Sequence, residues 1–341
     1  MWIVVAGVFL LSAGVVRFAR RVALKTALLD IPNERSSHEQ PEPRLGEAAF
    51  VPVVLLAVGL QAMGLLAPRE ALPAAGSGLS AAGGLPGVVF AAFLSGAIAL
   101  FAVSFVDDCF SLSTTVRFAV QFAAAFGVLF ALWLSAQGSS GNLGFLPSAL
   151  SPQLSALSFL SLSLLTLWIV ALINIYNFMD GIDGIAGLQA VVAGIAWCVF
   201  GILLSAPFVA FLGACVAAGA LGFLTLNWPP AKIFMGDAGS TVLGYIFATV
   251  PLIALVESRW AVRYARGGLT DALLIAAALV VWPFLADGTF TILRRLKKRE
   301  NIFRAHRSHL YQRLVIAGRS HVQVTCLYGA LAVVGAVLAW R

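Results

Sequence analysis

Ten long apolar runs constrain the fold of this chain more than any other feature of its sequence. A helix needs about 20 apolar residues to cross the hydrocarbon core of a bilayer, and the runs are close to that length. Apolar residues make up 60% of the chain and charged residues only 11%, whereas a soluble domain carries roughly 25% charged residues. The chain therefore cannot cover a globular surface with polar side chains, which excludes a soluble enzyme, a coiled coil and a disordered chain.

We predict an all-α integral membrane protein with about ten transmembrane helices, forming a single polytopic membrane domain over residues 1–341. The boundary between the sixth and seventh helices rests on Pro207, because proline interrupts helices and the apolar run around it is too long for one span. The predicted spans are 2–19, 48–67, 85–106, 116–136, 157–176, 184–204, 207–226, 238–257, 270–292 and 322–340.

Basic residues divide the connecting loops into two sets. Most Lys and Arg residues follow odd-numbered spans, with the largest cluster between Arg294 and Arg319. Cytoplasmic loops of membrane proteins are enriched in Lys and Arg, so we predict that these loops face the cytoplasm and that both termini lie outside. The arginines of segment 258–269 go against this division. The net charge of +7 is explained by such loops, and no nucleic acid partner is expected.

The acidic residues follow the same division, because Asp107, Asp108, Asp180, Asp183 and Asp237 all lie at predicted cytoplasmic ends of spans. The outer loops are rich in Gly, Ser, Ala and Pro and carry little chemistry. The chain has no P-loop, no HExxH and no CxxC pair. We therefore predict a site at the inner membrane boundary, formed by loops near 20–47, 107–115, 174–184, 227–237 and 293–321.

Two adjacent carboxylates, Asp107 and Asp108, end the third predicted span, and Arg117 and Gln121 follow them. Adjacent carboxylates repel each other and lose hydration at a membrane boundary, which is costly unless a cation or a proton transfer requires them. This makes the pair a catalytic candidate. A simple polar cap on the helix is the alternative interpretation.

A second polar segment ends the fifth predicted span. Asn174, Asn177 and Asp180 are three residues apart, so they share one side of a helix for as long as it lasts. Asp180 and Asp183 each precede a glycine, and glycine lets the backbone approach a ligand closely. Carboxylate and carboxamide oxygens are suitable ligands for Mg²⁺. An ordinary turn between two spans is the alternative.

Two further segments carry groups suited to anions. Asp237 begins the eighth span among small residues, and a helix start of this kind can hold phosphate or a metal that bridges phosphates. An ordinary aspartate N-cap is the alternative. His306, Arg307 and His309 in the last inner loop suit a diphosphate, unless the loop only lies on anionic lipid. Asp287 within the ninth span is a functional candidate because carboxylates inside membranes are rare.

The four segments together resemble the polyprenyl-phosphate N-acetylhexosamine-1-phosphate transferases. Residues 107–121 are similar to the family pattern DDxxxLSxxxRxxxQ, and residues 177–184 to NFxDGxDG. Residues 234–240 are similar to FMGDxGS, and residues 306–313 to HRxHxYQR. The last pattern and the segment from Asp30 look most like the bacterial glycosyltransferase-4 branch that primes O-antigen and similar envelope glycans, including lipopolysaccharide. Where that branch continues PRGGG, this chain has RLGE and lacks two of the glycines.

The resemblance implies transfer of an N-acetylhexosamine 1-phosphate from a UDP-sugar to undecaprenyl phosphate, with release of UMP, in the bacterial inner membrane. It implies Mg²⁺, or Mn²⁺, as cofactor, and it is compatible with a homodimer. It assigns Asp107 and Asp108 to catalysis on the lipid phosphate. The implied metal residues are Asp237, Asn177 and Asp180. The implied substrate-binding residues are Asn174, Asp183, Asn227, His306, Arg307, His309, Arg117 and Arg44.

Three alternatives belong to other functional classes. A cation-coupled transporter would use the aspartates, including Asp287, as a relay across the membrane. An intramembrane aspartyl protease would need a Tyr-Asp pair, whereas here Tyr176 is followed by Asn177. A catalytically silent member of the same family is the third, and the missing glycines are the feature that favours it.

Overall fold

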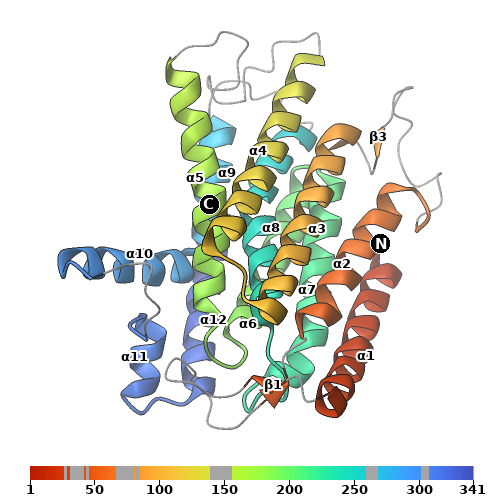
Figure 1. The fold of residues 1–341 in the computed structure, drawn as a ribbon. Coiled ribbons are helices and arrows are strands. Elements are labelled where there is room, and N and C mark those ends of the chain that lie inside the picture. Colours follow the sequence, from red (N-terminus) through yellow and green to blue (C-terminus); the bar gives the residue numbers. More distant parts are fainter. Residues whose placement is uncertain are drawn as a thin grey trace.

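The computed structural model describes residues 1–26, 29–30, 42–43, 46–66, 80–81, 85–138, 156–258, 268–300 and 307–340. These residues form a bundle of long apolar helices (Figure 1), which confirms the prediction of an all-α integral membrane protein. Eight of the described helices are long and apolar enough to cross a bilayer. They are α1 (Trp2–Thr26), α3 (Gly87–Phe110), α4 (Thr114–Gly138), α5 (Ala156–Met179), α6 (Ile185–Leu203), α7 (Pro207–Asn227), α8 (Gly236–Glu257) and α12 (His321–Leu338).

The two other predicted spans are also helical but differ from these eight. The second is α2 (Glu47–Ala62), which is shorter and contains Pro52. The ninth consists of α9 (Gly268–Val280) and α10 (Trp282–Lys297), a bent pair that counts as a ninth span if the two are taken together. A short helix, α11 (Leu310–Ile316), precedes α12.

Two short antiparallel pairs of strands complete the described chain. β1 (Leu29–Asp30) pairs with β2 (Glu42–Pro43), and β3 (Ser80–Ala81) pairs with β4 (Leu85–Pro86). In Figure 1, β1 lies at the lower end of the bundle near the level of α11, and β3 lies near the upper end. We call the lower end the motif end, because the polar segments described below meet there. Its cytoplasmic orientation stays a prediction from the loop charges.

The core of the bundle lies around α6, α7 and α8. In α8, 94% of an apolar stretch of 18 residues is buried inside the protein, against 28% of the corresponding stretch in α1. The closely packed pair α6 and α7 uses glycine at the contact, because a Cβ atom at Gly194 or Gly213 would overlap the backbone of the opposite helix. Small residues of this kind allow helices in membranes to approach closely. The outer helices instead expose large apolar side chains, among them Phe122, Phe126 and Leu56.

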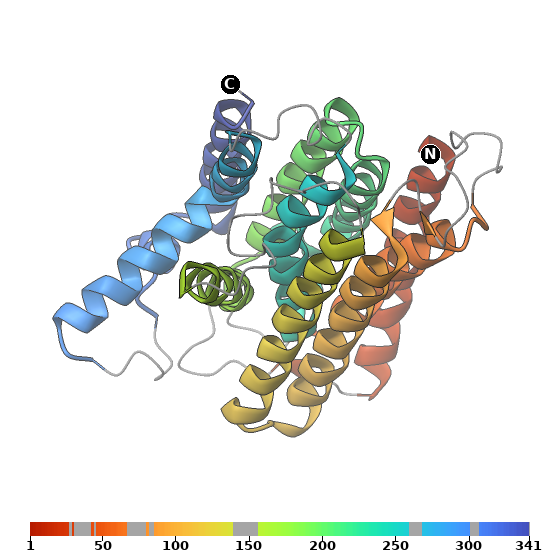
Figure 2. The same ribbon diagram turned by 90° about the horizontal axis from the view of Figure 1, so that it is seen from above.

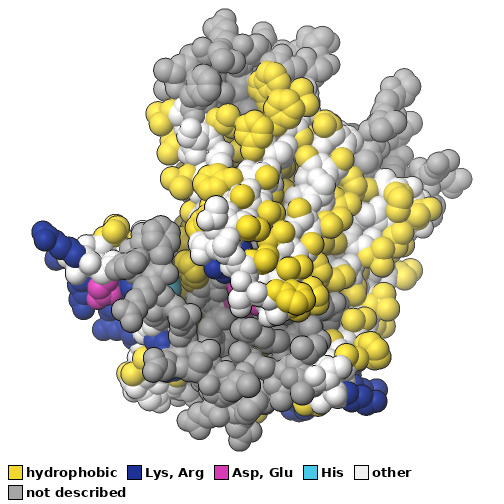
Figure 3. Space-filling view, viewed as in Figure 1, with side chains coloured by type: hydrophobic (Ala, Val, Ile, Leu, Met, Phe, Trp, Pro, Cys, Tyr) yellow, Lys and Arg dark blue, Asp and Glu magenta, His cyan; other side chains and the backbone are white. Residues whose placement is uncertain are grey.

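The surface follows the same division (Figure 3). Hydrophobic side chains cover the outer helices, whereas dark blue basic side chains gather at the free end of α10 and near the lower end of α1. The last turn of α10 contains Arg294, Arg295 and Lys297, and the last turn of α1 contains Lys25. This separation is expected where apolar surface meets lipid and basic residues lie at the interface.

The predicted boundary at Pro207 is confirmed, because α6 ends at Leu203 and α7 begins at Pro207. The buried carboxylate of Glu257, the last residue of α8, accepts hydrogen bonds from two amides in the first turn of α7. These are the amides of Phe208 at 2.6 Å and Val209 at 3.0 Å. The first amides of a helix have no partner within the helix, so Glu257 supplies the acceptors that the break requires.

Glu257→Ala should destabilise the protein by about 2 kcal/mol, because it leaves two buried amide donors without an acceptor. Thermal unfolding of the detergent-solubilised variant would measure the loss. Glu257→Gln retains one acceptor oxygen, and we expect it to recover part of the stability. Equal stability of wild type and the alanine variant would contradict this role for the carboxylate.

The break between α9 and α10 is a feature that was not predicted. The two helices meet at 79°, and Pro283 lies in the first turn of α10. Because the helix is broken there, the Val280 carbonyl accepts a hydrogen bond from Gln189 Nε2 of α6 at 2.9 Å in place of one from the next helical turn. Figures 1 and 2 show α10 extending away from the bundle beside α5. The break therefore aims α10 sideways at the level of the motif end.

Candidate functional site

The first and third polar segments meet at the motif end. The backbone of α3 ends where Ser111 adopts a left-handed conformation, which leaves Asp107 and Asp108 in its last turn. Asp108 Oδ2 accepts a hydrogen bond at 3.0 Å from the backbone amide of Asp237, in the first turn of α8. This bond joins residues that are far apart in the sequence, and it places the carboxylate of Asp108 against the start of α8.

Arg117, in the first turn of α4, lies between the carboxylates of both segments. Its Nη1 is 2.9 Å from Asp107 Oδ2 and 4.0 Å from Asp237 Oδ2. The other oxygen of Asp107 accepts a hydrogen bond from the Leu112 amide at 2.6 Å. Asp107 is thus held by neighbours on both oxygens, with a side chain only 10% exposed, whereas the side chain of Asp237 is 40% exposed. Asp237 is therefore more open to a ligand than Asp107.

The donor set fits a divalent cation that completes its coordination with substrate. The carboxylates of Asp107 and Asp237 lie within 4.0 Å of the one guanidinium, and the carboxylate of Asp108 binds the Asp237 amide, so the group carries excess negative charge. Among the described residues no three His, Cys, Asp or Glu side chains lie close enough to hold a metal by themselves. Mg²⁺ commonly binds through one or two carboxylates, water and substrate phosphates. An exposed carboxylate at Asp237 beside Asp108 suits that mode.

The two carboxamides of the second polar segment contact α4 and α8. Asn174 Nδ2 donates to Gln121 Oε1 on α4 at 2.7 Å. Asn177 Nδ2 donates to the Ser240 hydroxyl on α8 at 3.0 Å. Since Ser240 lies one turn after Asp237, Asn177 lies close to the start of α8. The two predicted metal residues Asn177 and Asp237 are therefore joined through Ser240.

Asp183 and Asn227 brace the loops around the site. Asp183 Oδ2 accepts a hydrogen bond from the Ala231 amide at 3.0 Å and lies 3.2 Å from His321 Nδ1. Asn227 is buried, and its side chain binds the Gly184 amide at 3.0 Å and the Ile233 carbonyl at 2.9 Å. Both were predicted to bind substrate. In this structure their visible partners belong to the protein itself.

The first loop reaches the third segment through a glycine that the chain retains. The Gly46 amide donates to the Phe234 carbonyl at 3.0 Å. A Cβ atom at Gly46 would overlap this carbonyl and the Phe223 ring. Of the three glycines in the family pattern, the one that remains therefore occupies a position where backbone must touch backbone. Arg44, a predicted substrate residue next to it, lies outside the described residues.

The last inner loop docks onto the second segment through Tyr311. Its hydroxyl donates to the Phe178 carbonyl at 3.0 Å, and a Cβ atom at Gly181 would overlap that hydroxyl. Burial, followed by the charges of Asp180 and Asp287, raises the pKa of the Tyr311 hydroxyl well above its ordinary value. Tyr311 is therefore a neutral donor that holds the two loops together.

The predicted diphosphate residues in this loop are only partly described. His309 is buried next to α10, with its ring stacked on Tyr311 at a centroid distance of 5.8 Å. Arg307 is exposed, and its charge acts on Tyr311, as does that of Asp180. His306 lies outside the described part of the chain. The structure thus brings His309, Arg307 and Asp180 around one tyrosine.

The sequence did not reveal several partners of these residues. His321 beside Asp183 and Tyr328 beside Asp287 belong to α12, which was predicted only as the last span. Neither belongs to a recognisable pattern, and each lies at least 40 residues from its partner. Ser320 caps the start of α12 directly before His321, but a cap of this kind predicts a helix start and not a contact with Asp183.

Comparison with known proteins gives consistent matches. A family model described as glycosyl transferase family 4 matches residues 90–255. Decaprenyl-phosphate N-acetylglucosaminephosphotransferase of Mycolicibacterium smegmatis is 30% identical, over 91% of this chain and 74% of that protein. A probable undecaprenyl-phosphate N-acetylglucosaminyl 1-phosphate transferase of Bacillus subtilis is 28% identical, over 94% of this chain and 79% of that protein. A phospho-N-acetylmuramoyl-pentapeptide-transferase of a Synechococcus species is 34% identical over 44% of this chain and 40% of that protein.

Proposed function

Because the chain belongs to the superfamily of polyprenyl-phosphate N-acetylhexosamine-1-phosphate transferases, we propose that it transfers N-acetylglucosamine 1-phosphate from UDP-N-acetylglucosamine to undecaprenyl phosphate. UMP is the second product. The choice of sugar is supported by the Mycolicibacterium and Bacillus relatives, which are both named for N-acetylglucosamine. We place the reaction at the bacterial inner membrane, where its product would prime an O-antigen or another envelope glycan.

The junction of Asp108, Arg117 and Asp237 is the observation that carries this proposal. Transfer of a phosphoryl group needs an attacking and a leaving oxygen in line, with the charge of the diphosphate neutralised. Here the carboxylate of Asp237, 40% exposed, lies 4.0 Å from the Arg117 guanidinium, and the Asp237 amide binds the carboxylate of Asp108. Such a group can bind a cation and orient phosphate oxygens at the end of a membrane bundle, where a lipid phosphate and a soluble nucleotide can meet.

In the proposed reaction, an oxygen of the lipid phosphate attacks the β-phosphorus of the donor. The bond between this phosphorus and the oxygen bridging it to the α-phosphate breaks, and UMP leaves with that oxygen. Asp237 would hold Mg²⁺ with help from Asn177 and Asp180, and the cation would neutralise the diphosphate. Asp108 would orient the lipid phosphate, and Asp107 would keep Arg117 in place beside it.

The remaining predicted residues divide between the nucleotide and the diphosphate. Asp183, Asn174 and Asn227 shape the loops that would surround the uridine. Arg307 would contact the diphosphate, because a cationic donor forms its strongest hydrogen bonds with such oxygens, and His309 would approach the diphosphate from the same loop. His306 and Arg44 are proposed to assist them from the neighbouring loops.

Removal of the metal should stop the reaction. We expect purified protein with undecaprenyl phosphate, UDP-N-acetylglucosamine and Mg²⁺ to release UMP, and we expect EDTA to suppress this release until Mg²⁺ or Mn²⁺ is restored. Omission of the lipid is the matched control for hydrolysis of the donor. UMP release that persists in EDTA would contradict the metal assignment. Release with another UDP-N-acetylhexosamine only would correct the sugar and leave the reaction in place.

A cation-coupled transporter is the second candidate, and the position of the carboxylates disfavours it. Asp107, Asp108 and Asp237 gather at one end of the bundle, whereas a relay across the membrane needs groups along its depth. Transport predicts uptake of a solute into vesicles without release of UMP. The proposed transfer requires release of UMP without uptake.

A further inference from the structure

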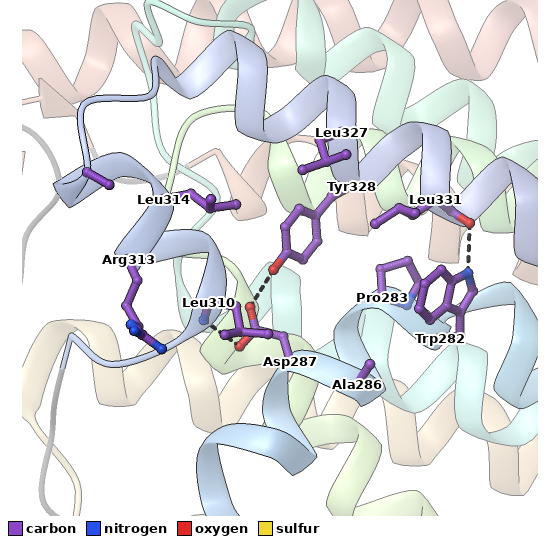
Figure 4. A pocket seen from close by; sticks show the side chains of 11 residues that line it. Trp282, Pro283, Ala286, Asp287, Leu310, Arg313, Leu314, Leu327, Tyr328 and Leu331 are labelled. Carbon is purple, nitrogen blue, oxygen red and sulfur yellow. Dashed lines mark hydrogen bonds between the residues drawn. The ribbon is translucent and has the colours of Figure 1, made fainter. Parts of the chain in front are cut away.

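A buried carboxylate on α10 joins three helices next to the site. Asp287 is 1% exposed, although burial costs a carboxylate much of its hydration. Its Oδ1 accepts hydrogen bonds from the Leu310 amide at 2.8 Å and from His309 Nδ1 at 3.1 Å. Its Oδ2 accepts from the Tyr328 hydroxyl at 2.6 Å and the Tyr311 amide at 3.0 Å. Figure 4 shows the bonds to Leu310 and Tyr328 beside an open pocket of about 550 Å³.

Packing alone does not explain a carboxylate at this position. Apolar residues of similar volume often replace buried charged groups without loss of stability, and the neighbours Ala286, Leu327 and Leu331 are already apolar. A carboxylate adds a fixed set of acceptors for a histidine ring and for the first amides of α11. Asp287 therefore determines both the position and the orientation of the loop that precedes α11.

The contact with Asp287 also fixes a hydrogen on one nitrogen of the His309 ring. An ionised carboxylate only accepts hydrogen bonds, so the bond between them requires a hydrogen on Nδ1. The ring can then approach a ligand only through Nε2. Carboxylates orient the functional histidines of metal sites and of catalytic triads in the same way.

Tyr311 transmits this arrangement to the second polar segment. Its amide is bound to Asp287, and its hydroxyl donates to the Phe178 carbonyl at the end of α5. One residue thus connects the carboxylate on α10 with the segment that carries Asp180 and Asp183. A shift at Asp287 would change the position of His309 relative to both aspartates.

We propose that Asp287 is a positioning residue for the transfer reaction, which fixes a hydrogen on Nδ1 of His309 and orients the ring of this histidine toward the second polar segment. It acts through His309 and has no contact of its own with substrate. The inference rests on the proposed function, in which His309 contacts the diphosphate.

A double-mutant cycle tests whether Asp287 acts through His309. Asp287→Asn keeps the size of the side chain and one acceptor. We expect it to lower kcat/KM for the nucleotide sugar about 10–100-fold, as when carboxylates that orient functional histidines are lost. In a His309→Gln background, the same change should cost less than about threefold, because the ring is absent. An equal cost in both backgrounds would overturn the proposal.

Glu257→Gln is the matched control for lost stability. Glu257 is also a buried carboxylate that binds two amides at a helix start, but it lies at the other end of α8 from Asp237. We expect both variants to unfold at lower temperature and only Asp287→Asn to lower kcat/KM. A similar loss of kcat/KM in Glu257→Gln would assign the effect to stability.

The position of the hydrogen on the His309 ring can be measured independently of enzyme activity. The chain contains four histidines, so ¹⁵N-histidine NMR spectra can be assigned by replacing them singly. We expect the Nδ1–H signature of His309 in the wild type and its loss in Asp287→Asn, since a carboxamide can accept or donate. An unchanged signature would overturn the positioning role even in an active enzyme. Wild-type protein that releases no UMP would refute the proposed function, while the NMR result still decides the ring state.

Discussion

Asp237→Ala should lower the rate of UMP release at least about 1,000-fold and leave membrane insertion intact. Loss of a metal that neutralises the diphosphate removes several kcal/mol of transition-state stabilisation, and each 1.36 kcal/mol corresponds to a factor of ten in rate. The fold should survive, because the side chain is 40% exposed and its backbone amide, which alanine retains, makes the bond to Asp108. Steady-state kinetics of the purified variant measure the rate of UMP release, and gel filtration measures whether the fold survives.

Asp271→Ala is the control for this variant. Asp271 is likewise an aspartate in the first turn of a helix, α9, and its side chain is exposed, but it belongs to none of the four polar segments. We expect wild-type activity from it. Retention of more than a tenth of wild-type activity by Asp237→Ala would remove the metal from this residue.

Gly181→Ala should reduce kcat/KM about 10–100-fold by pushing the last inner loop away from the second polar segment. The added Cβ atom would overlap the Tyr311 hydroxyl, which must then leave the Phe178 carbonyl. A displacement of about 1 Å at a site of this kind can cost 100-fold in rate. Gly127→Ala is the control, since a Cβ atom at Gly127 meets no neighbour within 4 Å.

The collision itself can be tested by removing the second partner. Tyr311→Phe alone should cost less than about fivefold, because it loses one hydrogen bond and keeps the buried ring. In the Gly181→Ala background it should restore most of the activity, since the overlapping hydroxyl is gone and only a tight contact with the ring carbon Cζ, at 3.0 Å, remains. A double variant that is as impaired as Gly181→Ala alone would show that the loop contact does not explain the loss.

The features that could be predicted from the sequence are those that depend on residues close together in the chain. Apolar runs of span length located the helices, and Pro207 located the break between α6 and α7. Polar residues in an apolar chain also identified Asp108, Arg117 and Asp237 as candidates before any contact between them was known. These signals extend over a few turns of helix at most, which is the range of sequence periodicity.

The contacts that build the site lie beyond that range. Asp287 meets residues of α11 and α12, and Asp183 meets His321, through packing between helices that are distant in the sequence. The break before Pro283 redirects α10. Because the sequence did not predict this break, it could not predict the contacts of Asp287 with α11 and α12 either. The roles of Asn227 as a brace and of Gly46 as a close backbone contact likewise depend on partners that no local pattern names.

The fate of the β-phosphate tests the proposed transfer most directly. UDP-N-acetylglucosamine labelled with ³²P at the β-phosphate would be incubated with protein, Mg²⁺ and undecaprenyl phosphate, and the lipid product extracted. We expect the label to enter the lipid together with the sugar and the released UMP to be unlabelled. Label that remains in UDP or appears as free phosphate, with none in the lipid, would contradict transfer of a sugar 1-phosphate.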